Sequence, residues 1–176
     1  MKATFKRGVH LNYGSKEPTK HLHTRDFVSD TVQLIMSMHI GAPSEPCVKK
    51  GDLVKLGQVI GTPVGFLGIP VHASVSGEVV AVERIPYLME EPVMAVTIRN
   101  DFLDEWTELH PLGSVESVDP AKIVPAIREA GICGMGGASF PTHVKLSLKP
   151  EQKCEMIIVN GAECETHLTC DHRLML

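Results

Sequence analysis

The residues best suited to chemistry lie in one glycine-rich segment toward the end of the chain. The segment runs from Gly131 to Lys145, GICGMGGASFPTHVK, and four of its first seven residues are glycine. Closely spaced glycines let a backbone approach a ligand with its N–H groups turned outward, which is how a phosphate is held without a metal. Lys145 adds a point charge for the same anion. The spacing matches neither G-x-G-x-x-G nor the Walker pattern, so standard nicotinamide and nucleotide-triphosphate loops are excluded.

We assign the anion contacts to three of these glycines, Gly134, Gly136 and Gly137. From spacing alone these glycines also fit a plain turn, and the spacing of Lys145 favours an exposed helix lysine. A second candidate is Asn160, which follows a short apolar run and begins the segment NGAECE. Ligands gather at the ends of strands in open α/β sheets, although an Asx turn would also account for this residue.

Two long motifs carry a family resemblance, GMGGASFPTHVKL and NGAECETHLTCDHRLML. They resemble the flavin-binding region of the C-subunit of the Rnf-type electron transport complexes, which is similar to the flavin subunit of respiratory complex I. The opening FKRGVH and the later segments HIGAPSEPCVKKGDLVKLGQVIG and PVHASVSGEVVAVE resemble the N-terminal domain of the same protein. The resemblance therefore covers nearly all of the 176 residues.

This resemblance implies roles for individual residues. The glycine loop and Lys145 would contact the phosphate and ring of flavin mononucleotide (FMN), with Asn160 and Glu163 as further cofactor contacts. Phe140 and Glu165 would lie at the incoming nicotinamide of NADH. A buried core position for Phe140, and an exposed turn for the two acids, are the alternatives. No catalytic base is expected, because the protein's task is to position the flavin and tune its potential.

The sequence departs from the complex I pattern at two places. Met135 stands where that flavin subunit has an arginine, which removes a positive charge beside the phosphate. Thr166 and His167 replace a Pro-Tyr pair after GAECE. We therefore expect the rigidity of this second segment, and part of the nicotinamide pocket, to differ from those of complex I.

The cysteines give no sign of a metal centre. There are five of them, an odd number with no C-x-x-C pair, so we expect reduced thiols. The cluster Cys164, His167, Cys170 and His172 fits no zinc or iron–sulfur spacing, and we expect no metal site in this chain. By resemblance, the full-length protein binds two four-iron clusters through ligands outside these residues.

Composition limits the classes of partner. The formal net charge of -4 provides no basic surface for nucleic acid, and aromatics at 5% argue against base-stacking platforms. No apolar run approaches the roughly 18 residues of a membrane span, and the N-terminus lacks a signal-like apolar stretch. With the resemblance, we expect a peripheral protein on the cytoplasmic side of the cell membrane, attached through partner subunits.

The first part of the chain predicts a small all-β unit. Alternation over residues 32–38 indicates a strand, and β-branched runs at 59–60, 71–75, 79–82 and 95–98 indicate others, with His72 facing outward. The pattern is similar to biotinyl and lipoyl domains, which are barrel-sandwich hybrids of two small sheets. In those carriers a lysine sits at the tip of a hairpin, whereas Gly61–Gly77 contains none. We therefore expect this fold without its carrier chemistry.

The second part predicts the start of an α/β domain. Asp119 and Pro120 are suited to begin a helix that ends at Gly131. A helix over 141–148, a buried strand over 155–160 and a helix from 169 should follow. The predicted fold class is thus mixed: residues 1–112 contain the barrel-sandwich hybrid at about 40–100, and residues 113–176 begin the FMN- and NADH-binding domain. The chain stops inside a helical pattern, so we expect the N-terminal portion of a longer protein.

The resulting functional hypothesis is an electron-transfer subunit of a membrane-associated NADH:ferredoxin oxidoreductase. It would accept hydride from NADH on FMN and pass electrons to iron–sulfur clusters and then to other subunits of an Rnf-type complex. Two alternatives stay open. One is a soluble relative that supplies a cobalamin- or amino-acid-reducing system, and the other is a non-catalytic scaffold built on the hybrid domain.

Overall fold

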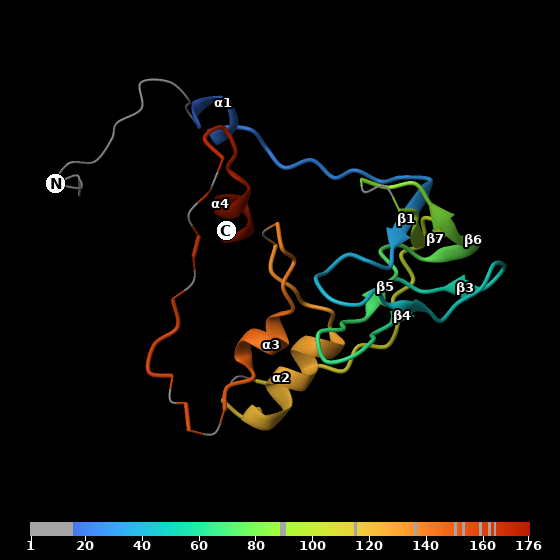
Figure 1. The fold of residues 1–176 in the computed structure, drawn as a ribbon. Coiled ribbons are helices and arrows are strands. Elements are labelled where there is room, and N and C mark those ends of the chain that lie inside the picture. The colour runs from blue at the N-terminus through green and yellow to red at the C-terminus, as the bar shows by residue number, and fades with distance from the viewer. Residues whose placement is uncertain are drawn as a thin grey trace. The chain divides into compact units, whose positions relative to one another are not determined.

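The computed structural model describes residues 16–176 except 89–90, 115, 136, 150, 153, 159, 162 and 164. The chain divides into two compact units, Val28–Lys153 and the combination of Met1–Phe27 with Cys154–Leu176, and each is described by itself. Figure 1 shows the elements of both. The predicted ligand residue Gly136 lies outside the described residues.

The larger unit contains two small antiparallel sheets. The first has the strand order β1-β7-β6-β3, and the second has the order β2-β4-β5. Their bounds are β1 Thr31–Ile35, β2 Glu45–Pro46, β3 Leu53–Val54, β4 Val59–Thr62, β5 Val71–His72, β6 Gly77–Ile85 and β7 Val93–Asn100. This architecture confirms the predicted barrel-sandwich hybrid, although the first strand ends at Ile35 instead of continuing to residue 38.

The core of this unit is built from the β-branched runs seen in the sequence. Val79, Val96 and Ile98 of the first sheet are fully buried together with Ile60 of the second sheet and Met36, which follows β1. Burying a side chain of this kind stabilises a fold by roughly 1.5–3 kcal/mol. The two sheets are therefore held face to face by side chains that alternate inward along their strands.

Gly77, the first residue of β6, lies very close to the backbone of β7 in the same sheet. Its φ is +145°, and a Cβ added there would lie 2.0 Å from the carbonyl oxygen of Arg99. No side chain can occupy that space, so the S-G-x-V pattern at the start of β6 has a direct steric reason.

Two helices follow the sheets in the same unit. Helix α2 spans Pro120–Glu129, and the Asp119 side chain accepts a hydrogen bond from the backbone N–H of Ala121 at 3.0 Å, which confirms the predicted cap. Helix α3 spans Thr142–Leu146, shorter than the predicted 141–148. None of the helices among the described residues is long and apolar enough to cross a membrane.

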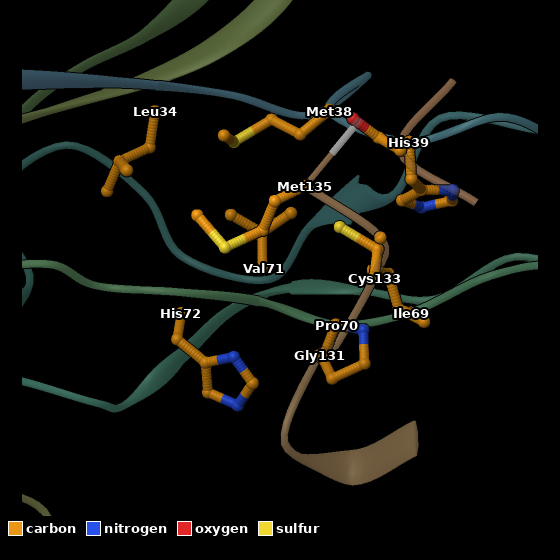
Figure 2. Close-up of a pocket in the computed structure, with 12 residues that line it drawn as sticks. Leu34, Met38, His39, Ile69, Pro70, Val71, His72, Gly131, Cys133 and Met135 are labelled. Carbon is orange, nitrogen blue, oxygen red and sulfur yellow. The ribbon is translucent and has the colours of Figure 1, made fainter. Parts of the chain in front are cut away.

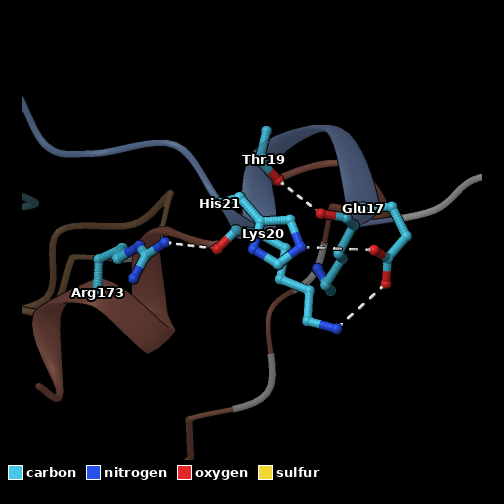
Figure 3. Close-up of polar contacts among 6 residues, drawn as sticks. Glu17, Thr19, Lys20, His21 and Arg173 are labelled. Carbon is cyan, nitrogen blue, oxygen red and sulfur yellow. Dashed lines mark hydrogen bonds and ion pairs between the residues drawn. The ribbon is translucent and has the colours of Figure 1, made fainter.

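The smaller unit contains helices α1, Glu17–Lys20, and α4, Cys170–Leu174. The Arg173 guanidinium donates to the carbonyl oxygens of Lys20 and Leu22 at 2.7 and 3.1 Å, and the Lys20 ammonium pairs with the Glu17 carboxylate at 3.3 Å. Figure 3 shows the contact of Arg173 with Lys20 and the contact of Lys20 with Glu17.

The strand predicted over 155–160 is wrong for the residues that are described. Residues 154–158 and 160 belong to no strand, and Met156, Ile157 and Ile158 are 75%, 75% and 84% exposed. A strand needs a neighbour to accept its backbone hydrogen bonds, and the described part of this unit contains only α1 and α4. The apolar run alone therefore did not determine the conformation.

Candidate flavin-phosphate site

The glycine loop is closed at its base like a hairpin. Cys133 and Pro141 form an antiparallel bridge, the Gly134 N–H donates to the Phe140 carbonyl at 2.8 Å, and the Thr142 N–H donates to the Ile132 carbonyl at 3.0 Å. These contacts fix the two stems of the loop, and the residues between them form its tip.

The tip of the loop surrounds a cavity of about 210 Å³. Its lining residues are Gly134, Gly137, Ala138, Ser139, Phe140 and Lys145. Among the described residues, no hydrogen-bond partner is found for the backbone N–H groups of Gly137, Ala138 and Ser139. Consecutive unpaired N–H groups in a turn are the usual cradle for an anion. The cavity is large enough for a phosphate group, but it is too small for a whole flavin.

Lys145 supplies the positive charge at this cavity. Its ammonium lies 5.8 Å from the centroid of the Phe140 ring and 3.2 Å from where a Cβ on Gly134 would be. Helix α3 carries the lysine, and the loop carries the aromatic ring. The ring and the close approach to Gly134 therefore hold the ammonium over the loop, within the range of a cation–π contact.

The individual glycines have different surroundings. The N–H of Gly134 is already bonded to Phe140, so this residue offers space for the lysine instead of a donor. Nothing lies within 4 Å of a Cβ added to Gly137, and its φ is outside the left-handed range. Ser139 has a φ of +44°, an uncommon value for a residue other than glycine, at the point where the loop turns back.

A second cavity, of about 380 Å³, lies between the loop and the hybrid domain (Figure 2). Most of its wall is apolar and comes from the hybrid domain, and the loop contributes Cys133, Gly134 and Met135. The remaining lining residues are Leu34, Met38, His39, Ile69, Pro70, Val71, His72, Gly131 and Ser139. Met135, which replaces the arginine of complex I, thus lines an apolar space rather than the cavity beside Lys145.

The remaining candidate residues, Asn160, Glu163 and Glu165, belong to the smaller unit. Asn160 is exposed. Glu165 is also exposed, and its backbone carbonyl accepts from the Lys16 ammonium at 2.8 Å. Glu163 is half-buried and lines a cavity of about 510 Å³ within that unit.

Glu163 has a structural task in addition to its predicted role. Its carboxylate accepts from the Asp171 N–H at 2.8 Å and from the Cys170 thiol at 3.1 Å, at the beginning of α4. The hydrogen bond from the Asp171 N–H, followed by that from the Cys170 thiol, lowers the pKa of Glu163. The hydrogen bond between Cys170 and Glu163 also raises the pKa of the Cys170 thiol. Ligand atoms of these three residues lie within 4.8 Å of one another, and the hydrogen bonds of the helix cap account for that proximity.

Sequence reasoning missed two residues that lie on either side of the glycine loop and contact the hybrid domain. Arg128 in α2 and His143 in α3 both bond to carbonyl groups of the hybrid domain. The prediction that His72 faces outward was wrong, because its ring is half-buried, and a Cβ on Gly131 would lie 3.2 Å from it. Burial lowers the pKa of His72. The sequence did carry one signal for this contact, Gly131, because a glycine often stands where two segments of a chain lie close together.

Comparison with known families gives two matches in the expected order. Residues 3–103 match the RnfC barrel sandwich hybrid domain, and residues 127–176 match the Nuo51 FMN-binding domain. The first match covers more than half of the chain. The chain therefore belongs to the RnfC family, the C-subunits of the Rnf-type ion-translocating oxidoreductase complexes, with a barrel-sandwich hybrid followed by part of an FMN-binding domain.

Individual relatives carry corresponding names. The chain is 48% identical over 174 residues to the C-subunit of the Na(+)-translocating ferredoxin:NAD(+) oxidoreductase complex of Acetobacterium woodii, covering 98% of this chain and 39% of that protein. It is 40% identical over 177 residues to the C-subunit of the proton-translocating ferredoxin:NAD(+) oxidoreductase complex of Clostridium ljungdahlii, covering 100% and 39%. It is 44% identical over 142 residues to the C-subunit of the ion-translocating oxidoreductase complex of Pseudomonas aeruginosa, covering 80% and 18%. The chain thus spans about two fifths or less of the length of these relatives.

Proposed function

We propose that this chain provides the phosphate-binding loop for FMN in the electron-transfer subunit of a membrane-associated NADH:ferredoxin oxidoreductase. The observation that carries the proposal is the cavity at the loop tip: it is lined by Lys145 and by Gly137, Ala138 and Ser139, whose backbone N–H groups have no hydrogen-bond partner among the described residues. A phosphate accepts several hydrogen bonds and carries negative charge, so these groups fit it in both respects. The match to an FMN-binding domain, which includes the loop, supports the same ligand.

Each residue then has a defined task. Gly137, Ala138 and Ser139 bind the phosphate through their N–H groups, and Lys145 neutralises its charge. FMN bound here would supply the capacity to accept a hydride and to release electrons singly. Asn160 and Glu163 contact the flavin, and Phe140 and Glu165 orient the nicotinamide of NADH. The protein's contribution is positioning and the exclusion of water, because hydride transfer needs no general base.

The rest of the proposed reaction lies outside these residues. Two four-iron clusters, held by ligands outside these residues, would supply the onward route for electrons to other subunits of the complex on the cytoplasmic side of the membrane. In this account residues 1–112 form the hybrid region and residues 113–176 begin the flavin domain. The relatives are named for different ions, sodium in one and protons in another, so their names do not select the coupling ion.

The test uses the purified full-length protein. We expect it to contain FMN and to catalyse the reduction of ferricyanide by NADH. Glu165→Gln should keep its FMN content near that of the wild type and oxidise NADH more slowly, because this acid is placed at the nicotinamide. Glu155→Gln, an exposed acid of the same segment, is the matched control and should change neither quantity. A protein without flavin would contradict the proposal and favour a scaffold, and unchanged turnover in Glu165→Gln would contradict that residue's role.

A further inference from the structure

We infer that the hairpin which carries a lysine in biotinyl and lipoyl domains acts here as a fixed bracket for the glycine loop. Arg128 and His143 are the positioning residues that attach the loop's two stems to it. The contacts that define this bracket all lie within the larger unit. Only the predicted effect on FMN affinity rests on the proposed function.

The first attachment comes from the end of α2. The Arg128 guanidinium donates from Nη2 to the carbonyl of Gly65 at 3.0 Å and from Nε to the carbonyl of Gly68 at 3.2 Å. Both acceptors lie in the segment between β4 and β5, beside α2 in Figure 1. A planar guanidinium that binds two carbonyls of one short turn fixes the direction of approach as well as the distance.

The second attachment comes from α3, on the other side of the glycine loop. His143 is 3% exposed, and its Nε2 lies 2.9 Å from the carbonyl oxygen of Phe66. A carbonyl can only accept, so Nε2 carries the hydrogen. The ring also meets the Phe66 ring edge-on, with centroids 5.9 Å apart and an interplanar angle of 75°. The hairpin residue between the two acceptors of Arg128 is thus held by the helix that carries Lys145.

The third attachment is a close backbone approach at the start of the loop. Gly131 has a φ of +68°, and a Cβ there would lie 2.7 Å from the carbonyl oxygen of Pro70. Only glycine lets the chain leave α2 this close to the hairpin.

These contacts hold both stems of the glycine loop to the same hairpin, so the two ends of the loop cannot move independently of each other. Fixing the ends of a loop in advance removes part of the conformational entropy that a ligand would otherwise have to order. The N–H groups at the loop tip are therefore presented by the hybrid domain, although that domain contributes no residue to the phosphate cavity. This gives the domain a role without a carrier lysine.

The test is hydrogen–deuterium exchange of the full-length protein, followed in peptides that cover residues 131–145. Arg128→Ala and His143→Leu should each accelerate exchange in these peptides by about tenfold, as expected from losing hydrogen bonds worth about 1.4 kcal/mol. Peptides from β6 and β7 should exchange as in the wild type. Arg84→Ala is the matched control, because Arg84 also donates to a backbone carbonyl, that of Pro92 at 3.1 Å, within the hybrid domain.

Conservative variants separate positioning from general stability. His143→Gln can keep a donor near the position of Nε2 and should restore most of the protection that His143→Leu loses. Arg128→Lys keeps the charge without the planar pair of donors and should give an intermediate rate. These two variants also decide the question if either truncation prevents folding.

The outcomes distinguish the bracket from the flavin site. Wild-type exchange of residues 131–145 in both truncated variants would overturn the inference, and so would equal acceleration in β6 and β7. In an FMN titration, the dissociation constant should rise at least threefold in Arg128→Ala and stay unchanged in Arg84→Ala. If the wild type binds no FMN, the proposed function fails, and the exchange experiment alone decides the bracket.

Discussion

Gly137→Ala should separate flavin binding from folding. A Cβ at this position meets no atom within 4 Å, and its φ is one that alanine can adopt. Removing glycine's freedom from the unfolded chain should leave the free energy of unfolding unchanged or raise it by about 0.4–1 kcal/mol. Gly137 lines the cavity at the loop tip, however, so an added methyl group would keep the phosphate from closing on the N–H of this residue. Losing one charge-assisted hydrogen bond costs about 1.5–3 kcal/mol, so FMN should bind roughly ten- to a hundredfold more weakly.

The opposite pair of effects is expected for Gly51→Ala, in a turn of the hybrid domain. An added Cβ there also meets nothing within 4 Å, but φ is +92°, so alanine should lower the free energy of unfolding by about 1–2 kcal/mol. FMN affinity should not change. Thermal unfolding followed by circular dichroism, and titration of FMN fluorescence, measure the two quantities in both full-length variants. Wild-type FMN affinity in Gly137→Ala would refute the reasoning about the loop tip.

Three further predictions address the charge, the helix cap and the acid response. Lys145→Ala should weaken FMN by about 1–3 kcal/mol, and titrations at rising salt should show a shrinking difference, because the ammonium is exposed. Asp119→Ala removes the cap of α2 and should lower the free energy of unfolding by about 1 kcal/mol in denaturant titrations. The hydrogen bond from the Ser76 hydroxyl, followed by that from the Leu103 N–H, lowers the pKa of Asp101. The ionised carboxylate therefore stabilises the fold at pH values above its unfolded-state pKa, and this stabilisation is lost as the pH falls through the lowered pKa of the folded state. Asp101→Asn should therefore weaken the dependence of the free energy of unfolding on pH in this acidic range.

The hybrid domain was predictable because its signals are local and agree with one another. The runs around Val79 and Val96 are β-branched, their inward side chains are apolar, and Gly77 stands where a side chain is sterically excluded. The cap at Asp119 was predictable for the same reason, since an N-cap depends only on the residues next to it. Short-range chemistry therefore predicted these elements correctly.

The features that were missed depend on contacts between distant segments. Arg128 bonds to residues 60 and 63 positions away, and His143 to one 77 positions away, which no periodicity reveals. The run at 155–160 had the composition of a strand, but a strand also requires a partner, and the described part of its unit contains none. For the glycine loop, the phosphate site stays a prediction, and only the structure shows that Gly134 uses its N–H internally.

The most direct test of the central claim compares FMN with riboflavin, which differs only by lacking the phosphate. Titrating the full-length protein with each flavin measures what the loop tip and Lys145 contribute. If these groups hold the phosphate, FMN should bind at least a hundredfold more tightly than riboflavin, about 2.7 kcal/mol, and most of that preference should vanish in Gly137→Ala combined with Lys145→Ala. Equal affinities for the two flavins would contradict the account.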